Sequence, residues 1–139
     1  MLIKKNKYVL LLAVLIISSV FALESVRAED KGRVFEMRTY FANEGKLKEL
    51  NARFRDYTVE LFKKHGMTNI GYWVPTDNKE NKLVYILAYS SKEAREKSWK
   101  GFLNDPDWKA AYKASIKDGR LVKKIENVFF KGTDFSTIK

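Results

Sequence analysis

Hydrophobic and polar positions alternate with a period of two near the start of the globular part of the chain. Val34, Glu36, Arg38 and Tyr40 alternate with Phe35, Met37, Thr39 and Phe41. Because successive side chains of a strand point to opposite faces, residues 34–41 are predicted as a strand. One of its faces is apolar and the other carries charges.

The spacing then changes to three and four residues, which is typical of an amphipathic helix. Its apolar positions are Leu47, Leu50, Phe54, Tyr57 and Leu61. Residues 43–45 form the turn before the helix. Gly66 stands where helices commonly end in a left-handed residue, so the helix is predicted to end there.

Two short segments rich in strand-forming residues follow, at 67–74 and 83–89, and a polar loop separates them. They are predicted to form a hairpin. Ser90 or Ser91 then caps a second helix, which carries Glu93 in its first turn. The inward stripe of this helix is Ser98, Trp99, Phe102 and Leu103.

The pair Asp105-Pro106 is a helix cap followed by a first helical residue, so the chain is predicted to restart as a third helix. Its inward face is Trp108, Ala111, Tyr112 and Ser115. Gly119 ends it, and residues 121–131 form the last strand. The order βαββαβ predicts a ferredoxin-like α+β fold, in which helices cover one face of an antiparallel sheet.

The strand at 83–89 is apolar throughout, although an antiparallel sheet with one wet face should alternate. We expect Val84, Ile86 and Ala88 to face the helices. We expect Leu83, Tyr85, Leu87 and Tyr89 to face a second layer. A second copy of the same sheet would supply that layer, so the pattern predicts a homodimer with a two-fold interface.

Four motifs together resemble the NIPSNAP family. They are the Trp-bracketed run 97–109, the segments 65–67 and 71–73, and the closing segment 133–136. The resemblance covers about residues 34–136. It implies a dimeric α+β barrel domain, and it implies no particular reaction.

The N-terminus has the features of a secretory signal peptide. Lys4, Lys5 and Lys7 precede an apolar run, and the segment closes on Val26-Arg27-Ala28. We expect cleavage after Ala28, with Ala22 as a weaker site, and a secreted or periplasmic mature domain at residues 29–139. An uncleaved membrane anchor is the alternative; after cleavage we expect no membrane span.

The full chain has a net charge of +10, and removal of residues 1–28 would leave +7. The lysines are spread over every predicted helix, which is typical of solvated surfaces, and we expect no nucleic-acid partner. The chain contains no cysteine and one histidine, so its stability must come from packing or oligomerisation. This composition also argues against a protein-ligated metal site, and no cofactor is predicted.

The single histidine, His65, lies in the last turn of the first predicted helix. A histidine there is favoured by the helix dipole and can bond free carbonyls, and it can also act as an acid or base. Glu36 and Arg38 share one strand face with Tyr40. If that face is buried, the two charges either pair with each other or bind a polar ligand.

Tryptophan, tyrosine and phenylalanine make up 14% of the chain. Most of them are expected in the core, but a cleft between helices and sheet lined with them would suit a flat apolar ligand. The candidate ligand-binding residues are Arg38, Tyr40, His65, Tyr72, Trp73, Tyr85 and Tyr89.

Two functional hypotheses follow. The leading one is a non-enzymatic ligand-binding or interaction module that acts as a homodimer and takes a small apolar or aromatic ligand. The alternative is a small cofactor-independent enzyme, similar to monooxygenases or isomerases, in which His65 moves protons and Arg38 or Tyr40 binds an oxyanion. A variant of it, haem binding through His65, requires the imidazole to point into the cavity.

Overall fold

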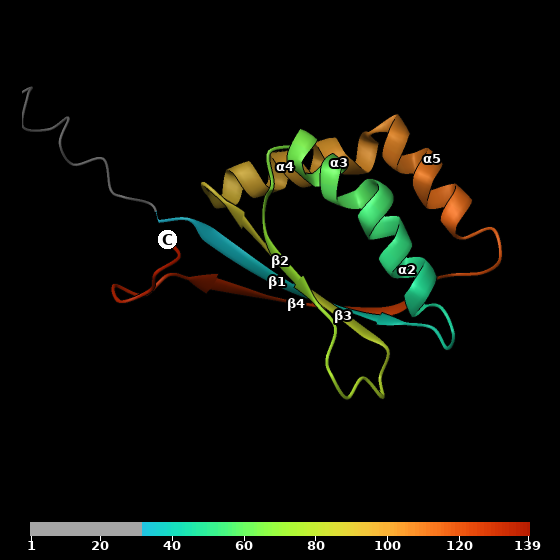
Figure 1. Ribbon diagram of the computed structural model, residues 1–139. Helices are drawn as coiled ribbons and strands as arrows, with labels where there is room; N and C mark the ends of the chain where they lie inside the picture. Colours follow the sequence, from blue (N-terminus) through green and yellow to red (C-terminus); the bar gives the residue numbers. More distant parts are fainter. Residues whose placement is uncertain (1–31) are drawn as a thin grey trace, which may run out of the picture. The chain divides into compact units, whose positions relative to one another are not determined.

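The computed structural model describes residues 32–139 (Figure 1). The predicted signal peptide and its cleavage sites lie outside the described residues. The elements follow the predicted order, with helices on one side of a sheet. The strands are β1 Val34–Ala42, β2 Thr68–Trp73, β3 Lys82–Tyr89 and β4 Val122–Lys131. The helical segments are α2 Leu47–Arg53, η1 Phe54–Thr58, α3 Val59–Lys64, α4 Lys92–Asn104 and α5 Pro106–Ser115.

The four strands form one antiparallel sheet in the order β2-β3-β1-β4. This is the ferredoxin-like α+β arrangement, and the prediction of the fold class is confirmed. Strand β1 pairs with both β3 and β4, so each residue from Val34 to Phe41 has one neighbour on either side. Glu36, for example, lies between Leu87 and Phe129.

The first helix runs from Leu47 to Lys64 but contains a turn of π-helix, η1, in its middle. The prediction that Tyr57 belongs to the buried stripe is wrong, since this side chain is 53% exposed. A π turn holds more residues than an α turn, so it shifts which later positions face the sheet. After the π turn, Phe62 is buried together with the predicted Leu61, and Gly66 ends the helix with a positive φ of 77°.

The predicted caps of the later helices are confirmed. The hydroxyl of Ser91 accepts a hydrogen bond from the Ala94 backbone N–H at the start of α4. The carboxylate of Asp105 accepts from the backbone N–H groups of Asp107 and Trp108 at the start of α5. The Asp105 cap fixes the break between α4 and α5, and the Ser91 cap fixes where α4 begins.

The orientation predicted for β3 is wrong. Leu83, Tyr85, Leu87 and Tyr89 face the helices and belong to the buried core, together with Phe54 and Phe62. Val84, Ile86 and Ala88 lie on the other side of the sheet. A strand that is apolar on both faces gives no periodic signal for its own orientation, and the larger side chains fill the thicker layer under the helices.

The sheet face without helices is also mostly apolar. Met37 lies between Ile86 and Val128 on it, and Phe35 lies between Ala88 and Phe130. Val128 and Phe130 on β4 are 47% and 42% exposed. We refer to these residues with Val84 and Ile70 as the open face. Within residues 32–139, no helix is long and apolar enough to cross a membrane.

Candidate functional site

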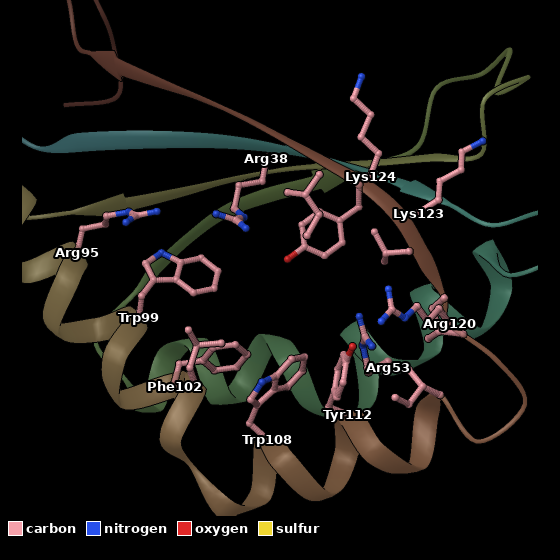
Figure 2. Close-up of a pocket in the computed structure, with 16 residues that line it drawn as sticks. Arg38, Arg53, Arg95, Trp99, Phe102, Trp108, Tyr112, Arg120, Lys123 and Lys124 are labelled. Carbon is pink, nitrogen blue, oxygen red and sulfur yellow. The ribbon is translucent and has the colours of Figure 1, made fainter.

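A cavity of about 830 Å³ lies between the sheet and helices α4 and α5 (Figure 2). Tyr40 and Ile125 line it from the sheet, and α4 and α5 contribute further aromatic and apolar side chains. The helix residues named in Figure 2 are Trp99, Phe102, Trp108 and Tyr112. This is the aromatic cleft between helices and sheet that the composition suggested.

Among residues 32–139, six basic residues and no acidic residue line this cavity. Arg38 and Arg53 face each other across it, and Arg95 and Arg120 stand near its two ends (Figure 2). Lys123 and Lys124 belong to β4, and the Lys124 ammonium lies over the ring of Phe41 instead of pointing inward. Arginine therefore supplies the charge inside the cavity.

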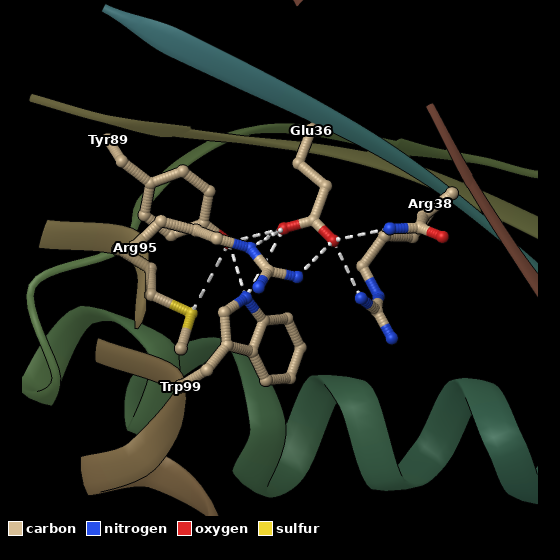
Figure 3. A network of polar contacts seen from close by, with 7 residues as sticks. Glu36, Arg38, Tyr89, Arg95 and Trp99 are labelled. Carbon is tan, nitrogen blue, oxygen red and sulfur yellow. Dashed lines mark hydrogen bonds and ion pairs between the residues drawn. The ribbon is translucent and has the colours of Figure 1, made fainter. Parts of the chain in front are cut away.

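One carboxylate, that of Glu36, holds two of these arginines beside the cavity (Figure 3). Arg38 Nη1 donates to Glu36 Oε1 at 2.7 Å. Arg95 donates twice, from Nε to Oε2 at 2.9 Å and from Nη2 to Oε1 at 2.8 Å. The hydroxyl of Tyr89 and the indole N–H of Trp99 also donate to Oε2, at 3.1 and 3.3 Å. We call these five residues the Glu36 cluster.

The Glu36 cluster is a largely buried network in which both carboxylate oxygens of Glu36 accept hydrogen bonds, while the buried Nε atom of Arg38 has no hydrogen-bond partner among the described residues. Glu36 is completely buried, and burial alone would raise its pKa. Hydrogen bonds from Arg95 and Arg38 outweigh this effect and lower the pKa of Glu36 to about 2. Burial raises the pKa of the Tyr89 hydroxyl well above its usual range, so this group is a donor at neutral pH. The predicted Glu36–Arg38 pair thus forms, with Arg95 as a second cation.

Arg53 is a different kind of basic residue. It ends α2 and is only 5% exposed. Its Nη1 donates to Ser115 Oγ at 3.1 Å, and its guanidinium lies 5.3 and 5.4 Å from the ring centres of Trp108 and Tyr112. Its Nε atom is buried without a hydrogen-bond partner. Burial lowers the pKa of Arg53, although arginine stays charged at neutral pH.

His65 does not line the cavity. Its Nε2 lies 2.7 Å from Asp105 Oδ2, and Lys64 Nζ lies 2.9 Å from the same oxygen. Hydrogen bonds from Lys64 and His65 lower the pKa of Asp105. A Cβ atom on Gly101 would come within 2.7 Å of His65 Nδ1, so α4 packs directly on the imidazole. His65 thus ties the end of α3 to the break between α4 and α5.

The other candidate ligand-binding residues are dispersed. Arg38 and Tyr40 line the cavity, while Tyr72, Trp73, Tyr85 and Tyr89 do not. Tyr85 is fully buried in the core, and burial raises the pKa of its hydroxyl. Tyr72 stacks on Tyr85, with ring centres 5.4 Å apart. Trp73 is 51% exposed on the side of the sheet away from the helices.

The sequence analysis did not identify Arg53, Arg95 or Arg120. Arg53 follows Leu50 by three residues, which places a charge on the buried stripe of an amphipathic helix. A charged residue on the apolar stripe of a helix could have predicted that Arg53 is a buried cation. Among residues 32–139, no three His, Asp or Glu side chains gather as the ligands of a metal ion would.

Comparison with solved structures gives the same fold. A NIPSNAP family protein with unknown function from Agrobacterium tumefaciens is 27% identical, with a TM-score of 0.69 over 78% of this chain and 96% of that chain. An uncharacterized NIPSNAP-like domain protein from Burkholderia xenovorans is 20% identical, with a TM-score of 0.67 over 76% and 90%.

A more distant likeness, to SnoaB, a cofactor-independent oxygenase from Streptomyces nogalater, is 15% identical, with a TM-score of 0.52 over 76% of this chain and 98% of that chain. It shows the fold alone. No match was found among curated proteins. The family model for NIPSNAP matches residues 35–137. Because this match spans well over half of the chain, the protein belongs to the NIPSNAP family.

Proposed function

We propose that this protein is a homodimeric binding module that takes a small aromatic or apolar ligand in the cavity of each copy. The observation that carries the proposal is the cavity itself. Its volume of about 830 Å³ lies within the range of small-molecule sites, roughly 300–1,000 Å³. Aromatic walls with a few polar groups are typical of such sites.

The walls are suited to a flat ring. Phe102 and Trp108 lie 4.4 Å apart between ring centres, and Trp108 lies 5.5 Å from Tyr112. These rings form one continuous aromatic wall on α4 and α5. The opposite wall carries Tyr40 and Ile125 from the sheet. An aromatic ligand between the two walls would bury apolar surface on both of its faces.

The enzyme alternative has weaker support. A general acid or base must come within hydrogen-bond reach of the substrate, and His65 is bonded to Asp105 away from the cavity. No acidic side chain of the part of the chain that the structure describes lines the cavity either, and Glu36 is held by two arginines. The binding hypothesis needs only the shape and the aromatic walls.

Titration with naphthalenemethanol, a neutral bicyclic probe, tests ligand binding. The variant Trp73→Phe leaves Trp99 and Trp108 as the only tryptophans, and both line the cavity. We expect the probe to quench this fluorescence and to give saturable heat by calorimetry in both the parent and the variant. Absence of binding at millimolar probe, or quenching that disappears in Trp73→Phe, would contradict the proposed site.

The homodimer is proposed from the open face. Met37, Ile86 and Val128 form an apolar row across three strands, and no helix of residues 32–139 lies over it. Strand β4 is an edge strand whose residues are exposed along most of its length, including the apolar Val128 and Phe130. Packing two such faces together about a two-fold axis would cover the apolar surface of both copies.

Light scattering of the mature domain tests the dimer, and we expect twice the monomer mass at micromolar concentration. Val128→Glu should shift the protein to monomer, because it places a charge in the centre of the proposed interface. The matched control is Ala110→Glu, which introduces the same charge on the exposed side of α5. A monomeric parent protein, or a dimer that tolerates Val128→Glu, would refute this interface.

We also propose that the domain is exported, because the sequence of residues 1–28 has the features of a cleaved signal peptide. Intact-mass analysis of the protein from its own cells should give a chain that begins at Glu29. A chain retaining Met1 in the soluble cytoplasmic fraction would disprove export.

A further inference from the structure

The wall of the cavity carries a buried cation that no acid neutralises. Within residues 32–139, no Asp or Glu forms an ion pair with Arg53, which is 5% exposed. Among the described residues, its one hydrogen bond goes to the neutral hydroxyl of Ser115, and its Nε atom has no partner. Burial of a charge without a counter-charge is costly, so this position favours the arrival of an anion.

The rest of the cavity reinforces that preference. Arg38 and Arg95 share the single carboxylate of Glu36, which leaves one positive charge in excess on that side. Arg120 adds an exposed cation at the other end. A cavity with arginines on several walls and no acidic lining residue concentrates anions.

The surroundings of Arg53 indicate which anion fits. Its guanidinium lies over the rings of Trp108 and Tyr112, so aromatic surface and positive charge are adjacent. A guanidinium presents a planar fork of N–H donors that matches the two oxygens of a carboxylate. A ligand with a carboxylate directly attached to an aromatic ring would satisfy the cation and the aromatic wall together.

We propose that the ligand of this cavity is an aromatic carboxylate, held through its acidic group by Arg53 and through its ring by the wall of Trp108, Phe102 and Tyr112. This inference rests on the proposed binding function and specifies its ligand class. Arg120 attracts the anion toward the mouth, and Arg53 binds it.

Paired titrations with naphthoate and naphthalenemethanol test the proposal, because the two probes share the ring system and differ in charge. In the parent protein we expect naphthoate to bind about tenfold to a hundredfold more tightly, since hydrogen bonds to charged groups are the strong ones. Arg53→Met keeps the apolar stem and removes the charge. It should abolish the preference, so that naphthoate and naphthalenemethanol bind this variant with similar affinity.

The matched control is Arg120→Met, which removes the same charge from an exposed position and should keep most of the preference for naphthoate. Retained binding of the neutral probe by Arg53→Met shows that the cavity is intact. If neither probe binds the parent protein, the proposed function fails. If both bind equally, the cavity is a binding site but the anion inference is overturned, and a preference that survives Arg53→Met overturns the role of Arg53.

Discussion

Two buried arginines at the same helix–sheet interface differ in what surrounds them. Arg38 donates to the buried carboxylate of Glu36, which also receives Arg95. Arg53, across the cavity, has aromatic rings and one hydroxyl as its neighbours. Arg38 therefore has an acidic partner on one side of the cavity, and Arg53 has none among the described residues on the other side.

The difference suggests separate roles: the charges of the Glu36 cluster stabilise the fold, and the charge of Arg53 is available to bind an anion. In the Glu36 cluster a buried carboxylate pairs with two arginines, so removal of this carboxylate should affect folding. The positive charge of Arg53 has no such partner, so its removal should affect binding more than folding. Substitutions in the Glu36 cluster and at Arg53 can therefore test whether the two sites differ in this way.

The largest effect is expected for Glu36→Gln. It leaves the guanidinium groups of Arg38 and Arg95 beside a neutral amide, and breaking a buried ion pair by removing one partner typically costs about 3–5 kcal/mol. Urea unfolding measures this loss. The matched control is Glu126→Gln, whose partner Lys124 is exposed, and it should cost about 0–1 kcal/mol. Equal losses in the two variants would contradict a structural role for Glu36.

The second effect is a loss of stability in acid. The pKa of Glu36 is lowered to about 2 in the folded protein, below the value of about 4.3 expected when unfolded. A group with a depressed folded pKa stabilises above its unfolded pKa and loses that contribution as pH falls, here between about pH 5 and pH 2. Shifts of this size correspond to roughly 3 kcal/mol. Urea unfolding at several pH values should show this dependence in the parent protein.

Glu36→Gln is the reference for the acid experiment. Asp105 also has a lowered pKa, so some pH dependence should remain in this variant. The difference between the parent and the variant isolates the contribution of Glu36. Curves that stay parallel from neutral pH to pH 2 would show that Glu36 does not titrate as described.

A smaller effect is expected for Trp99→Phe. The indole N–H donates to the hydroxyl of Tyr89 at 2.9 Å and lies 3.3 Å from Glu36 Oε2. Phenylalanine cannot replace this donor, and we expect a loss of about 1–2 kcal/mol. Trp108→Phe is the matched control, because within residues 32–139 the indole of Trp108 makes no hydrogen bond. A larger loss in the control would mean that ring volume outweighs the hydrogen bond.

The smallest effect on folding is expected for Arg53→Met. Removal of a buried charge without an acidic partner relieves a desolvation cost and offsets the lost contacts with Ser115, Trp108 and Tyr112. Urea unfolding should show a change within about 1 kcal/mol, or a gain. If Arg53→Met lost as much unfolding free energy as Glu36→Gln, Arg53 would be as important for folding as the Glu36 cluster. That result would contradict the proposed difference between Arg38 and Arg53.

Local signals in the sequence were sufficient for most of the fold. The alternation at 34–41, the cap residues Ser91 and Asp105 and the positive φ at Gly66 act within a few residues of the chain. Such signals are readable because caps and periodicity depend on near neighbours. Of the site, the same reasoning predicted the Glu36–Arg38 pair and an aromatic cleft between helices and sheet.

Contacts between distant segments decided the rest. Strand β3 is apolar on both faces, so only the packing of Phe54 and Phe62 against Tyr85 determined which face lies under the helices. The π turn in the first helix moved Tyr57 to the surface. His65 forms a hydrogen bond with Asp105, which lies 40 residues later in the sequence.

The order of the elements, their caps and the family can be read from the sequence, because these depend on residues that are close along the chain. The final position of each charge depends instead on contacts that form only in the folded protein. Glu36 accepts hydrogen bonds from Arg95, 59 residues later in the sequence. Arg53 donates to Ser115, which is 62 residues later. Whether a buried arginine has an acidic partner depends on what the fold brings beside it, and that proximity creates the difference between the Glu36 cluster and the cation at Arg53.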